Sequence, residues 1–485
     1  MRITKKWETV IGLEVHVQLK TETKLFCSCP NKFGAEPNAH VCPGCAGMPG
    51  ALPVLNARAV ELAVRAGLAL NCRINLESVF ARKSYFYPDL PAGFQTSQLE
   101  PPICAAGSFE GIRINRIHLE DDAGKCVHAG NGETLVDLNR AGTPLIEIVT
   151  EPDFRSPAQA AEFMRRLRYL LVYMGVTDAN MEEGGMRCDV NVSLRPSGSE
   201  AYGTRTELKN LNSFNNIEDA AECEAERHRE VLEAGGVLVQ ETRQFDPENG
   251  ITRALRSKEE ATDYRYFPNP DLPAVRISRE FVEAVAAAMP EQPEARAKRY
   301  LDDLGLHQEE VAILAASAEL GDYFEAALAL QNSPKRLAGL ILGELLPECN
   351  RRGLGIAEVT GKAGHAGQGE PVAPVFTAER LAHTAAVIES GKVSLKVAHE
   401  LFADLLDSGE ALEKLAEQRG LLQVSDSSAL EGAVLEAIAA NPEEAAAYRG
   451  GKSKLLSFFV GQVMRRTKGA GNPALINELL KKHLQ

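Results

Sequence analysis

Residues 13–19 read Leu-Glu-Val-His-Val-Gln-Leu, and their strict alternation indicates the fold class. Side chains of a β-strand point alternately to its two faces, so the four apolar residues share one face. Glu14, His16 and Gln18 share the other face. The stretch therefore predicts a strand that buries one face in a core and carries a carboxylate beside an imidazole on the other.

The same alternation recurs farther along the chain. Residues 186–195 are apolar at even positions and polar at odd positions, among them Asp189. Two shorter stretches also collect charged residues on one face, namely Arg116, His118 and Glu120, and Arg205, Glu207 and Lys209. Several half-buried strands with polar outer faces are typical of an antiparallel sheet.

Two helices are expected between these strands. One begins at Ser156-Pro157, a capping residue followed by proline at the first helical position, and ends near Gly175. The other runs from about residue 216 to Gly235-Gly236. Strands and helices in this order favour an antiparallel α+β domain over a doubly wound sheet.

The second part of the chain has a different pattern. From about residue 291 it is almost purely helical, with breaks at Gly353, Gly391 and Gly409. A chain of 485 residues is also too long for one hydrophobic core. We expect an α+β domain over 1–290, a helical domain over 291–409 and a small helical tail domain over 410–485.

Composition narrows the class of protein. The chain is 44% apolar and 25% charged, as globular proteins are, and its net charge of -14 argues against unspecific coating of nucleic acid. The N-terminal residues carry no signal-peptide pattern, and no long uncharged apolar stretch predicts a membrane span. Ten cysteines without a secretion signal favour reduced thiols in the cytoplasm.

Four of these cysteines form two close pairs. Cys27-x-Cys29 is followed by Cys42-x-x-Cys45, with Pro43-Gly44 inside the second pair. Four thiols in two pairs suit a closed tetrahedral zinc site, which leaves no open position for catalysis. Free thiols or a disulfide are the alternatives.

Carboxylates form a second candidate constellation. Residues 118–122 read His-Leu-Glu-Asp-Asp, and Glu147 lies inside the apolar run 145–149. A carboxylate among apolar neighbours is costly unless it is paired or bound to metal, and oxygen-rich clusters suit Mg²⁺. The simpler interpretation of the polar face of Glu14 and His16 is a solvated surface.

Phosphate chemistry is indicated by charge rather than by a phosphate-binding loop. Gly450-Gly451-Lys452-Ser453 matches only half of that motif, because Ala446 stands where a glycine is required. The last segment is strongly basic in an otherwise acidic chain. It contains Arg449, Lys452, Lys454, Arg465, Arg466, Lys468, Lys481 and Lys482. These side chains either solvate a helical face or contact the phosphates of a nucleic acid.

Long motifs in one order resemble the B subunit of the tRNA-dependent amidotransferase, the GatB family. Those motifs are Val-Ile-Gly-Leu-Glu-Val-His-Val-Gln-Leu (10–19), Phe-Gly-Ala-Glu-Pro-Asn (33–38), Pro-Gly-Ala-Leu-Pro-Val-Leu-Asn (49–56), Tyr-Phe-Tyr-Pro-Asp-Leu-Pro (85–91), Asp-Leu-Asn-Arg-Ala-Gly-Thr-Pro-Leu-Ile-Glu-Ile-Val (137–149), Arg-Cys-Asp-Val-Asn-Val-Ser-Leu-Arg (187–195), Leu-Lys-Asn-Leu-Asn-Ser-Phe (208–214) and Asp-Tyr-Arg-Tyr-Phe-Pro (263–268). Val-Gly-Gln-Val-Met (460–464) resembles the tail of that family.

The resemblance implies a cradle-shaped α+β domain related to the glutamine synthetase fold, then the helical domain and a tail that touches tRNA. It implies Mg²⁺ near Glu14, His16, Glu120 and Glu147, with Asp121 as a further catalytic candidate where the family usually has glutamate. It also implies zinc at the four cysteines. Lys83, Asn139 and Arg140 are predicted to contact the nucleotide.

The activity implied is an amidation driven by ATP. The enzyme would phosphorylate the side-chain carboxylate of mischarged Glu-tRNA(Gln) or Asp-tRNA(Asn), and ammonia would then displace the phosphate. The chain shows no amidase signature, so ammonia would come from an amidase-type A subunit, clamped by a small C subunit in a bacterial heterotrimer. One alternative is a non-catalytic, zinc-containing scaffold that binds tRNA. Another is the archaeal-type relative, but that type carries an inserted domain, and the spacing of these motifs leaves no room for it.

Overall fold

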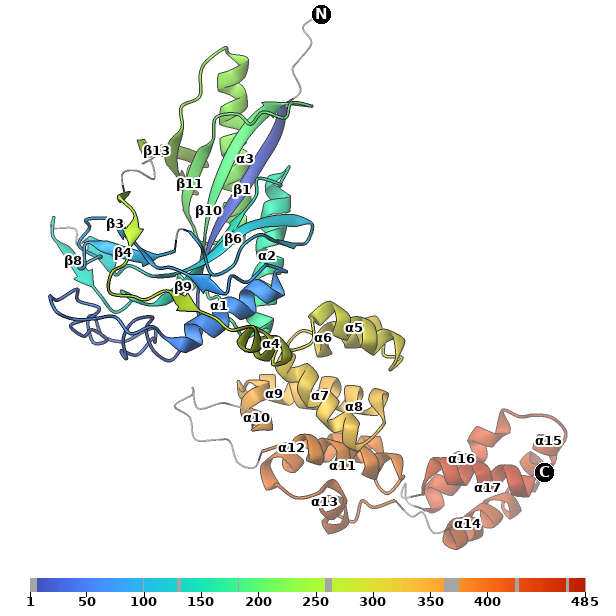
Figure 1. The fold of residues 1–485 in the computed structure, drawn as a ribbon. Helices are drawn as coiled ribbons and strands as arrows, with labels where there is room; N and C mark the ends of the chain where they lie inside the picture. Colours follow the sequence, from blue (N-terminus) through green and yellow to red (C-terminus); the bar gives the residue numbers. More distant parts are fainter. Residues whose placement is uncertain are drawn as a thin grey trace, which may run out of the picture. The chain divides into compact units, whose positions relative to one another are not determined.

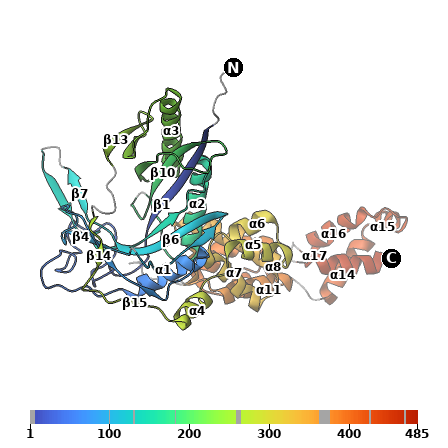
Figure 2. The ribbon, with the colours of Figure 1, turned by 45° about the horizontal axis from the view of Figure 1, so that its top comes forward.

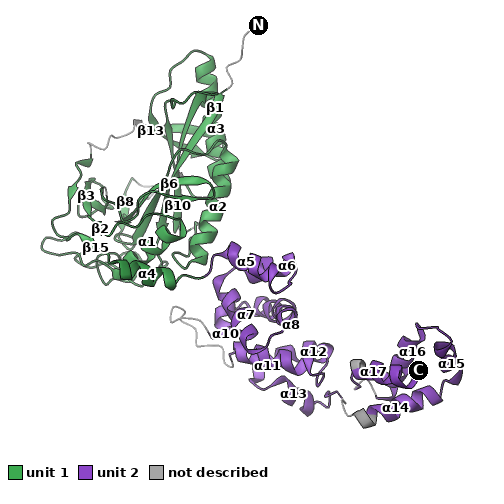
Figure 3. Ribbon diagram, turned by 45° about the vertical axis from the view of Figure 1, so that its right-hand side comes forward, with its two compact units in different colours: residues 1–290 green, residues 291–485 purple. Residues whose placement is uncertain are grey.

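The computed structural model describes residues 7–98, 100–128, 132–181, 183–257, 264–361, 375–423, 427–467 and 471–484. The chain forms two compact units, Met1–Pro290 and Glu291–Gln485, which are coloured separately in Figure 3. Each unit is described by itself.

The first unit is built on an eight-stranded sheet. Its strand order is β13-β12-β11-β10-β1-β9-β6-β5. The strands are β1 (Trp7–Gln18), β5 (Gly107–Phe109), β6 (Ile112–Asp121), β9 (Pro144–Thr150), β10 (Met186–Pro196), β11 (Thr206–Leu211), β12 (Glu241–Asp246) and β13 (Ile251–Ser257). The predicted α+β class is confirmed, and the strand that begins the chain lies near the middle of the sheet.

The sheet is mixed rather than purely antiparallel, so that part of the prediction is wrong. β11 and β12 run parallel, whereas the other neighbouring strands are antiparallel. Parallel neighbours need a long crossover connection. The helix α3 (Phe214–Glu233) lies between β11 and β12 in sequence and provides it.

A layer of helices covers one face of the sheet. Figures 1 and 2 show α2 (Pro157–Tyr173) and α3 beside the long strands β1 and β10. The apolar residues of β1 are buried against this layer, because Leu13, Val15 and Val17 are at most 1% exposed. α2 begins where predicted, since the Ser156 side chain accepts a hydrogen bond from the backbone N–H of Gln159.

Smaller elements surround this sheet. One small sheet consists of β14 (Phe267–Pro268), β3 (Ala81–Ser84) and β4 (Phe94–Ser97), and two further pairs join β2 (Glu77–Ser78) to β15 (Val275–Arg276) and β7 (Lys125–His128) to β8 (Thr134–Asp137). The remaining helices are α1 (Ala57–Ala69) and α4 (Arg279–Ala287). The cradle shape and the relation to glutamine synthetase remain predictions.

The second unit is helical, as predicted. Its helices are α5 (Pro293–Asp302), α6 (Gln308–Leu314), α7 (Ala318–Leu330), α8 (Pro334–Leu340), the π-helix η2 (Ile341–Leu345), α9 (Leu346–Arg352), α10 (Ile356–Thr360), α11 (Ala378–Glu389), α12 (Leu395–Ser408), α13 (Leu412–Gln418), α14 (Ser427–Ala439), α15 (Pro442–Arg449), α16 (Leu455–Arg466) and α17 (Pro473–Leu484). Among the described residues, no helix is both long and apolar enough to cross a membrane.

Two hydrophobic clusters lie within the second unit. The first extends from Tyr300 to Ala416 and includes Leu412 on α13. The second begins at Leu430 and ends at Leu484. The boundary expected near residue 410 therefore falls inside the first cluster, and the change of core comes after it.

Candidate active site on the polar face of the sheet

The pairing of three strands brings two imidazoles and a carboxylate into one row. His16 on β1 lies opposite Glu147 on β9, and Glu147 lies opposite His118 on β6. Residues directly opposite each other in a sheet point to the same face. The side chain of Glu120 joins them, because it follows His118 by two residues on β6.

These four side chains are in direct contact. His118 Nε2 lies 3.0 Å from Glu147 Oε2 and 3.3 Å from Glu120 Oε2. His16 Nε2 lies 3.6 Å from Glu147 Oε2 and 3.9 Å from Glu120 Oε1. The hydroxyl of Ser97 donates a hydrogen bond to Glu120 Oε2 at 2.9 Å. His16, Glu120 and Glu147 offer ligand atoms within 4.8 Å of one another, close enough to hold one metal ion.

The environment keeps this cluster charged. Burial opposes the protonated form of His118, but the carboxylates of Glu147 and Glu120 outweigh it and raise its pKa to about 9. Burial likewise opposes ionisation of Glu147, yet His118 and His16 hold the pKa of that carboxyl well below its usual value. In the absence of another cation, the imidazoles thus serve as the counter-charges of the acids.

A second acidic group adjoins the first on the same face. Glu14, Asp189 and Glu207, from β1, β10 and β11, also offer oxygen atoms within 4.8 Å of one another. Lys209 Nζ donates a hydrogen bond to Asp189 at 2.8 Å and lies 3.4 Å from Glu207. The hydroxyl of Thr242 donates to Glu207 at 2.9 Å. Hard oxygen ligands of this kind suit Mg²⁺.

Both groups line one cavity of about 200 Å³. Lys83 on β3 also lines it, and its Nζ lies 4.7 Å from the centre of the Tyr264 ring. An adjacent cavity of about 310 Å³ reaches Asp122 and Arg187, whose guanidinium donates to both carboxylate oxygens at 2.9 Å. The site is therefore a charged recess that is continuous with further space.

Of the residues predicted from the sequence, Glu14, His16, Glu120, Glu147 and Lys83 all line the 200 Å³ cavity. They come from four different strands, so the fold gathers residues that lie far apart in the sequence.

Three other candidates lie elsewhere. Asp121 lines a separate cavity of about 270 Å³ and accepts a hydrogen bond from the N–H of Thr96 at 2.8 Å, and burial raises its pKa to about 7. Asn139 accepts a hydrogen bond from the N–H of His40 at 2.8 Å, and Arg140 donates to the carbonyl of Gly124 at 2.7 Å. Both side chains hold neighbouring loops.

Four site residues were not predicted, namely His118, Asp189, Glu207 and Lys209. The signal that could have found them was present, since each lies on the polar face of an alternating strand. The alternation along a strand does not reveal which strands are neighbours in the sheet.

Comparison with known protein families identifies the family to which this chain belongs. The GatB/GatE catalytic domain family matches residues 9–283, the span that contains the whole site. The chain belongs to the GatB family. A second family of that group, the GatB domain, matches residues 322–484.

Full-length relatives agree with this assignment. The chain is 51% identical to the B subunit of the aspartyl/glutamyl-tRNA(Asn/Gln) amidotransferase of Geotalea uraniireducens, over 99% of both chains. It is 50% identical to the protein of the same name from Nitratidesulfovibrio vulgaris, again over 99% of each. Membership of the GatB family thus covers nearly the whole chain.

The four cysteines expected to bind zinc lie together in this GatB chain. Cys45 Sγ lies 3.8 Å from Cys29 Sγ and 3.7 Å from Cys42 Sγ, and the four sulfur atoms lie within 4.8 Å of one another. Zinc–sulfur bonds of about 2.3 Å place the corners of a tetrahedron roughly 3.8 Å apart. The N–H of Cys42 also donates to Cys45 Sγ at 3.1 Å. All four are free thiols rather than disulfides, and their arrangement can hold zinc.

The predicted tRNA contacts in the described part of the tail lie at the ends of α15 and α16 and in the segment between these helices. Arg449 ends α15, Lys452 and Lys454 precede α16, and Arg465 and Arg466 end α16. Arg466 forms an ion pair with Glu436 at 2.9 Å, and Lys452, Lys454, Arg465 and Arg466 are all exposed. Lys468 lies outside the described residues.

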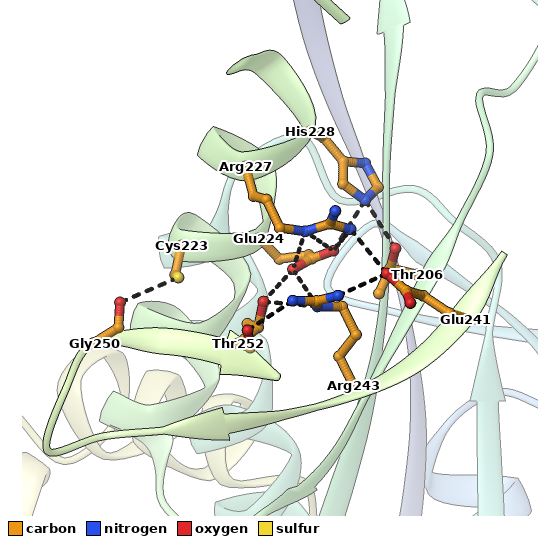
Figure 4. A network of polar contacts seen from close by, with 9 residues as sticks. All are labelled: Thr206, Cys223, Glu224, Arg227, His228, Glu241, Arg243, Gly250 and Thr252. Atoms are coloured by element: carbon orange, nitrogen blue, oxygen red, sulfur yellow. Dashed lines mark hydrogen bonds and ion pairs between the residues drawn. The ribbon is translucent and has the colours of Figure 1, made fainter. Parts of the chain in front are cut away.

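The reverse face of β11 and β12 carries a different polar cluster, shown in Figure 4. At its centre is Glu224 of α3, which is fully buried. Its carboxylate accepts hydrogen bonds from Arg227 at 2.6 Å and Thr252 at 2.7 Å, and lies 3.5 Å from Arg243. His228 Nε2 lies 3.0 Å from Glu224 and 2.8 Å from the Thr206 hydroxyl. This network fastens α3 to β11, which carries Glu207 of the second acidic group, and to β12 and β13.

Proposed function

We propose that this chain is a ligase subunit that amidates mischarged Glu-tRNA(Gln), Asp-tRNA(Asn) or both, at the expense of ATP. It would phosphorylate the side-chain carboxylate of the aminoacyl group and then let ammonia replace the phosphate. Its relatives of about 50% identity carry the name of the B subunit of an aspartyl/glutamyl-tRNA(Asn/Gln) amidotransferase, which supports this activity.

One observation carries the proposal, namely the two groups of metal-ligating side chains around the 200 Å³ cavity. Its walls contain five carboxylates, those of Glu14, Glu120, Glu147, Asp189 and Glu207. Lysine, arginine and histidine side chains share the cavity with them, and both groups present ligand atoms at metal-binding separation. We assign Mg²⁺ to them, with His16, Glu120 and Glu147 holding one position and Glu14, Asp189 and Glu207 another. Bound Mg²⁺ neutralises the charge of the transferring phosphoryl group.

The remaining residues of the site would orient the reactants. Lys209 and Lys83 bring positive charge to the same cavity, where it can stabilise the phosphoryl oxygens as the leaving group departs. Because carboxylate is a poor electrophile, phosphorylation is the step that makes attack by ammonia possible. Asn139 and Arg140 would support the nucleotide only indirectly, through the loops that they hold.

The rest of the assembly follows from the same chemistry. Ammonia must arrive unprotonated, so we propose delivery from a partner glutaminase, an amidase-type A subunit, with a small C subunit completing a heterotrimer in the bacterial cytoplasm. Zinc at Cys27, Cys29, Cys42 and Cys45 would be structural. The tail residues Arg449, Lys452, Lys454, Arg465, Arg466 and Lys468 would contact the tRNA backbone. Asp121, which lines another cavity, would act outside the phosphoryl-transfer step.

A non-catalytic scaffold is not favoured. A scaffold has no need of two groups of metal-ligating side chains around one cavity. Removal of one ligand separates the two hypotheses.

Glu147→Gln keeps the shape of the side chain and removes its charge. In the assembled complex we expect ammonia-dependent amidation and tRNA-stimulated ATP cleavage to fall by ~10²-fold or more, because an electrostatic group of the transition state is lost. Glutamine hydrolysis in the partner and binding of tRNA should continue. Added ammonia bypasses the glutaminase, so ordinary ammonia-dependent amidation by this variant would move the phosphoryl-transfer site elsewhere.

A further inference from the structure

One lysine of the first unit is completely buried. Lys24 follows β1 in the segment before Cys27 and is 0% exposed. Lysine is rarely buried, because its ammonium group loses the solvation of water unless an anion compensates for it. Among the described residues, its Nζ donates hydrogen bonds to the carbonyls of His40 at 2.7 Å and Leu138 at 3.2 Å, and no carboxylate forms an ion pair with it. The buried charge therefore needs an anion of another kind.

The cluster of four cysteines adjoins this lysine. Cys45 Sγ lies 4.0 Å from the same carbonyl oxygen of His40 that accepts the hydrogen bond from Lys24. Gly142 packs against both residues, because a Cβ atom at that position would meet Lys24 Cδ at 3.5 Å and Cys45 Cβ at 3.8 Å. The backbone N–H of Lys24 donates to the carbonyl of Cys29 at 3.0 Å. Main-chain and side-chain contacts thus hold the lysine beside both cysteine pairs.

A zinc ion bound by four cysteines leaves negative charge unbalanced. Each ligand is a thiolate, so the four sulfur atoms exceed the charge of one Zn²⁺ by about two. As a thiolate, Cys45 also has no proton to donate to the carbonyl of His40, and two negative atoms then face each other. The ammonium group of Lys24 lies on that oxygen and offsets both charges.

We propose that Lys24 is the counter-charge of the zinc site. It does not bind the metal, but it balances the thiolates and positions the carbonyl that faces Cys45. Its hydrogen bond to Leu138 also fastens the cluster to the loop before β9, the strand that carries Glu147. The inference rests on the zinc site of the proposed function and adds a residue on which the zinc affinity depends.

The test measures the Kd of Zn²⁺ on the full chain, in competition with a chromophoric chelator near neutral pH. Lys24→Met keeps the length and the apolar stem of the side chain and removes its charge. It should raise the Kd by about 10–100-fold, the effect typical of groups just outside the ligands of a metal. The control is Lys20→Met, which removes the same charge from an exposed lysine paired with Asp178 at 2.7 Å. Its Kd should stay within about a factor of two of wild type.

A second neutral variant separates charge from hydrogen bonding. Lys24→Gln keeps N–H donors for a carbonyl and lacks the positive charge, so it should raise the Kd of Zn²⁺ as Lys24→Met does. It also decides the question if Lys24→Met does not fold. Zinc binding by Lys24→Gln at wild-type affinity would overturn the inference, because hydrogen bonds to the carbonyls would then be sufficient.

Thermal unfolding followed by Trp7 fluorescence distinguishes the remaining outcomes. A counter-charge matters most when the thiolates are present, so Lys24→Gln should lose less stability without zinc than with it, and zinc should raise its Tm less than it raises that of wild type. Equal losses of Tm with and without zinc, at an unchanged Kd, would mean that Lys24 only holds the loops, which would overturn the inference and leave the zinc site intact. A wild-type chain that binds no zinc would overturn both.

Discussion

The two faces of strands β11 and β12 carry polar clusters that differ in geometry. On the reverse face, the two acids Glu224 and Glu241 meet the two arginines Arg227 and Arg243. On the cavity face, five carboxylates and His16 lie beside lysine and arginine side chains and form two groups whose ligand atoms lie within 4.8 Å of one another. The acids of the reverse face are engaged by arginines, whereas those of the cavity face are also placed to hold a cation from solution. We expect the first cluster to hold the fold and the second to bind.

The largest expected effect comes from making the same substitution on each face. Glu207 and Glu224 are 5% and 0% exposed, so they form a matched pair. Glu207→Gln should lower kcat/KM for amidation by roughly 10²–10³-fold with little change in Tm, because a ligand of the acidic group is lost. Glu224→Gln should lower Tm and keep near-normal kcat well below its melting temperature. If the two variants lost activity and stability in equal proportion, the distinction between the faces would be wrong.

The second prediction concerns the reverse face and pH. Burial opposes ionisation of Glu224, but His228, Arg227 and Thr252 outweigh it and lower its pKa to about 2. A depressed carboxyl pKa stabilises the fold above the unfolded-state value of about 4.3, and this stability disappears as pH falls toward 2. The stability gap between wild type and Glu224→Gln should therefore be about 3 kcal/mol at pH 7 and shrink steadily below pH 4.5.

Fluorescence of the single tryptophan, Trp7 on β1, reports unfolding of the first unit in the intact chain. Denaturant titrations at pH 7, 4 and 3 would follow the gap. A gap that stays constant with pH would mean that the carboxylate of Glu224 is not the source of the stability.

The third prediction concerns the cluster of Cys27, Cys29, Cys42 and Cys45, because four thiolates held together also bind a cation. We expect about one zinc per chain, and Cys42→Ser should release it and lower the Tm of the first unit by about 5 °C. Cys126→Ser is the matched control, since Cys126 lies on β7 outside the cluster and should retain the metal. Metal analysis with Trp7 fluorescence measures both effects. Metal-free wild-type protein with an unchanged Tm would refute the site.

Alternation along single strands was enough to predict much of this site. Because His16 and Glu14 are two residues apart on β1, their common face follows from the period of a strand. Pairing of distant strands does not follow from that period. Asp189 faces Glu14 across 175 residues of chain, and only packing of the helices on the apolar faces fixes that register.

Three candidates lie outside the 200 Å³ cavity for reasons that are equally local. Asp121 follows Glu120 directly on β6, so the pleat directs the two side chains to opposite faces. Asn139 and Arg140 lie in a loop after β8, where the polar side chains hold the backbone of neighbouring segments. The parallel pairing of β11 and β12 depends on the path of α3, which the period of a strand does not encode.

The smallest effect is expected in the tail, where the candidate binding residues are basic. Lys452, Lys454 and Arg465 are exposed and form no ion pair among the described residues, whereas Arg466 is paired with Glu436. Replacing the three unpaired cations with glutamine should raise KM for aminoacyl-tRNA by roughly tenfold at moderate salt and leave kcat unchanged, because the proposed catalytic site lies in the other unit. Removal of each phosphate interaction should also reduce the slope of log K against log salt by about 0.7–0.9.

The control for the tail is Arg466→Gln, which removes one cation that already has a carboxylate partner. Its effect on KM and on the salt slope should be smaller than that of Lys454→Gln, although both variants lose one positive charge. Measurements at about 50 and 200 mM salt separate a direct phosphate interaction from a change in net charge, since only the direct interaction is tied to the position of the residue. If Arg466→Gln and Lys454→Gln behaved alike, the net charge of the tail, and not the positions of its unpaired cations, would govern tRNA binding.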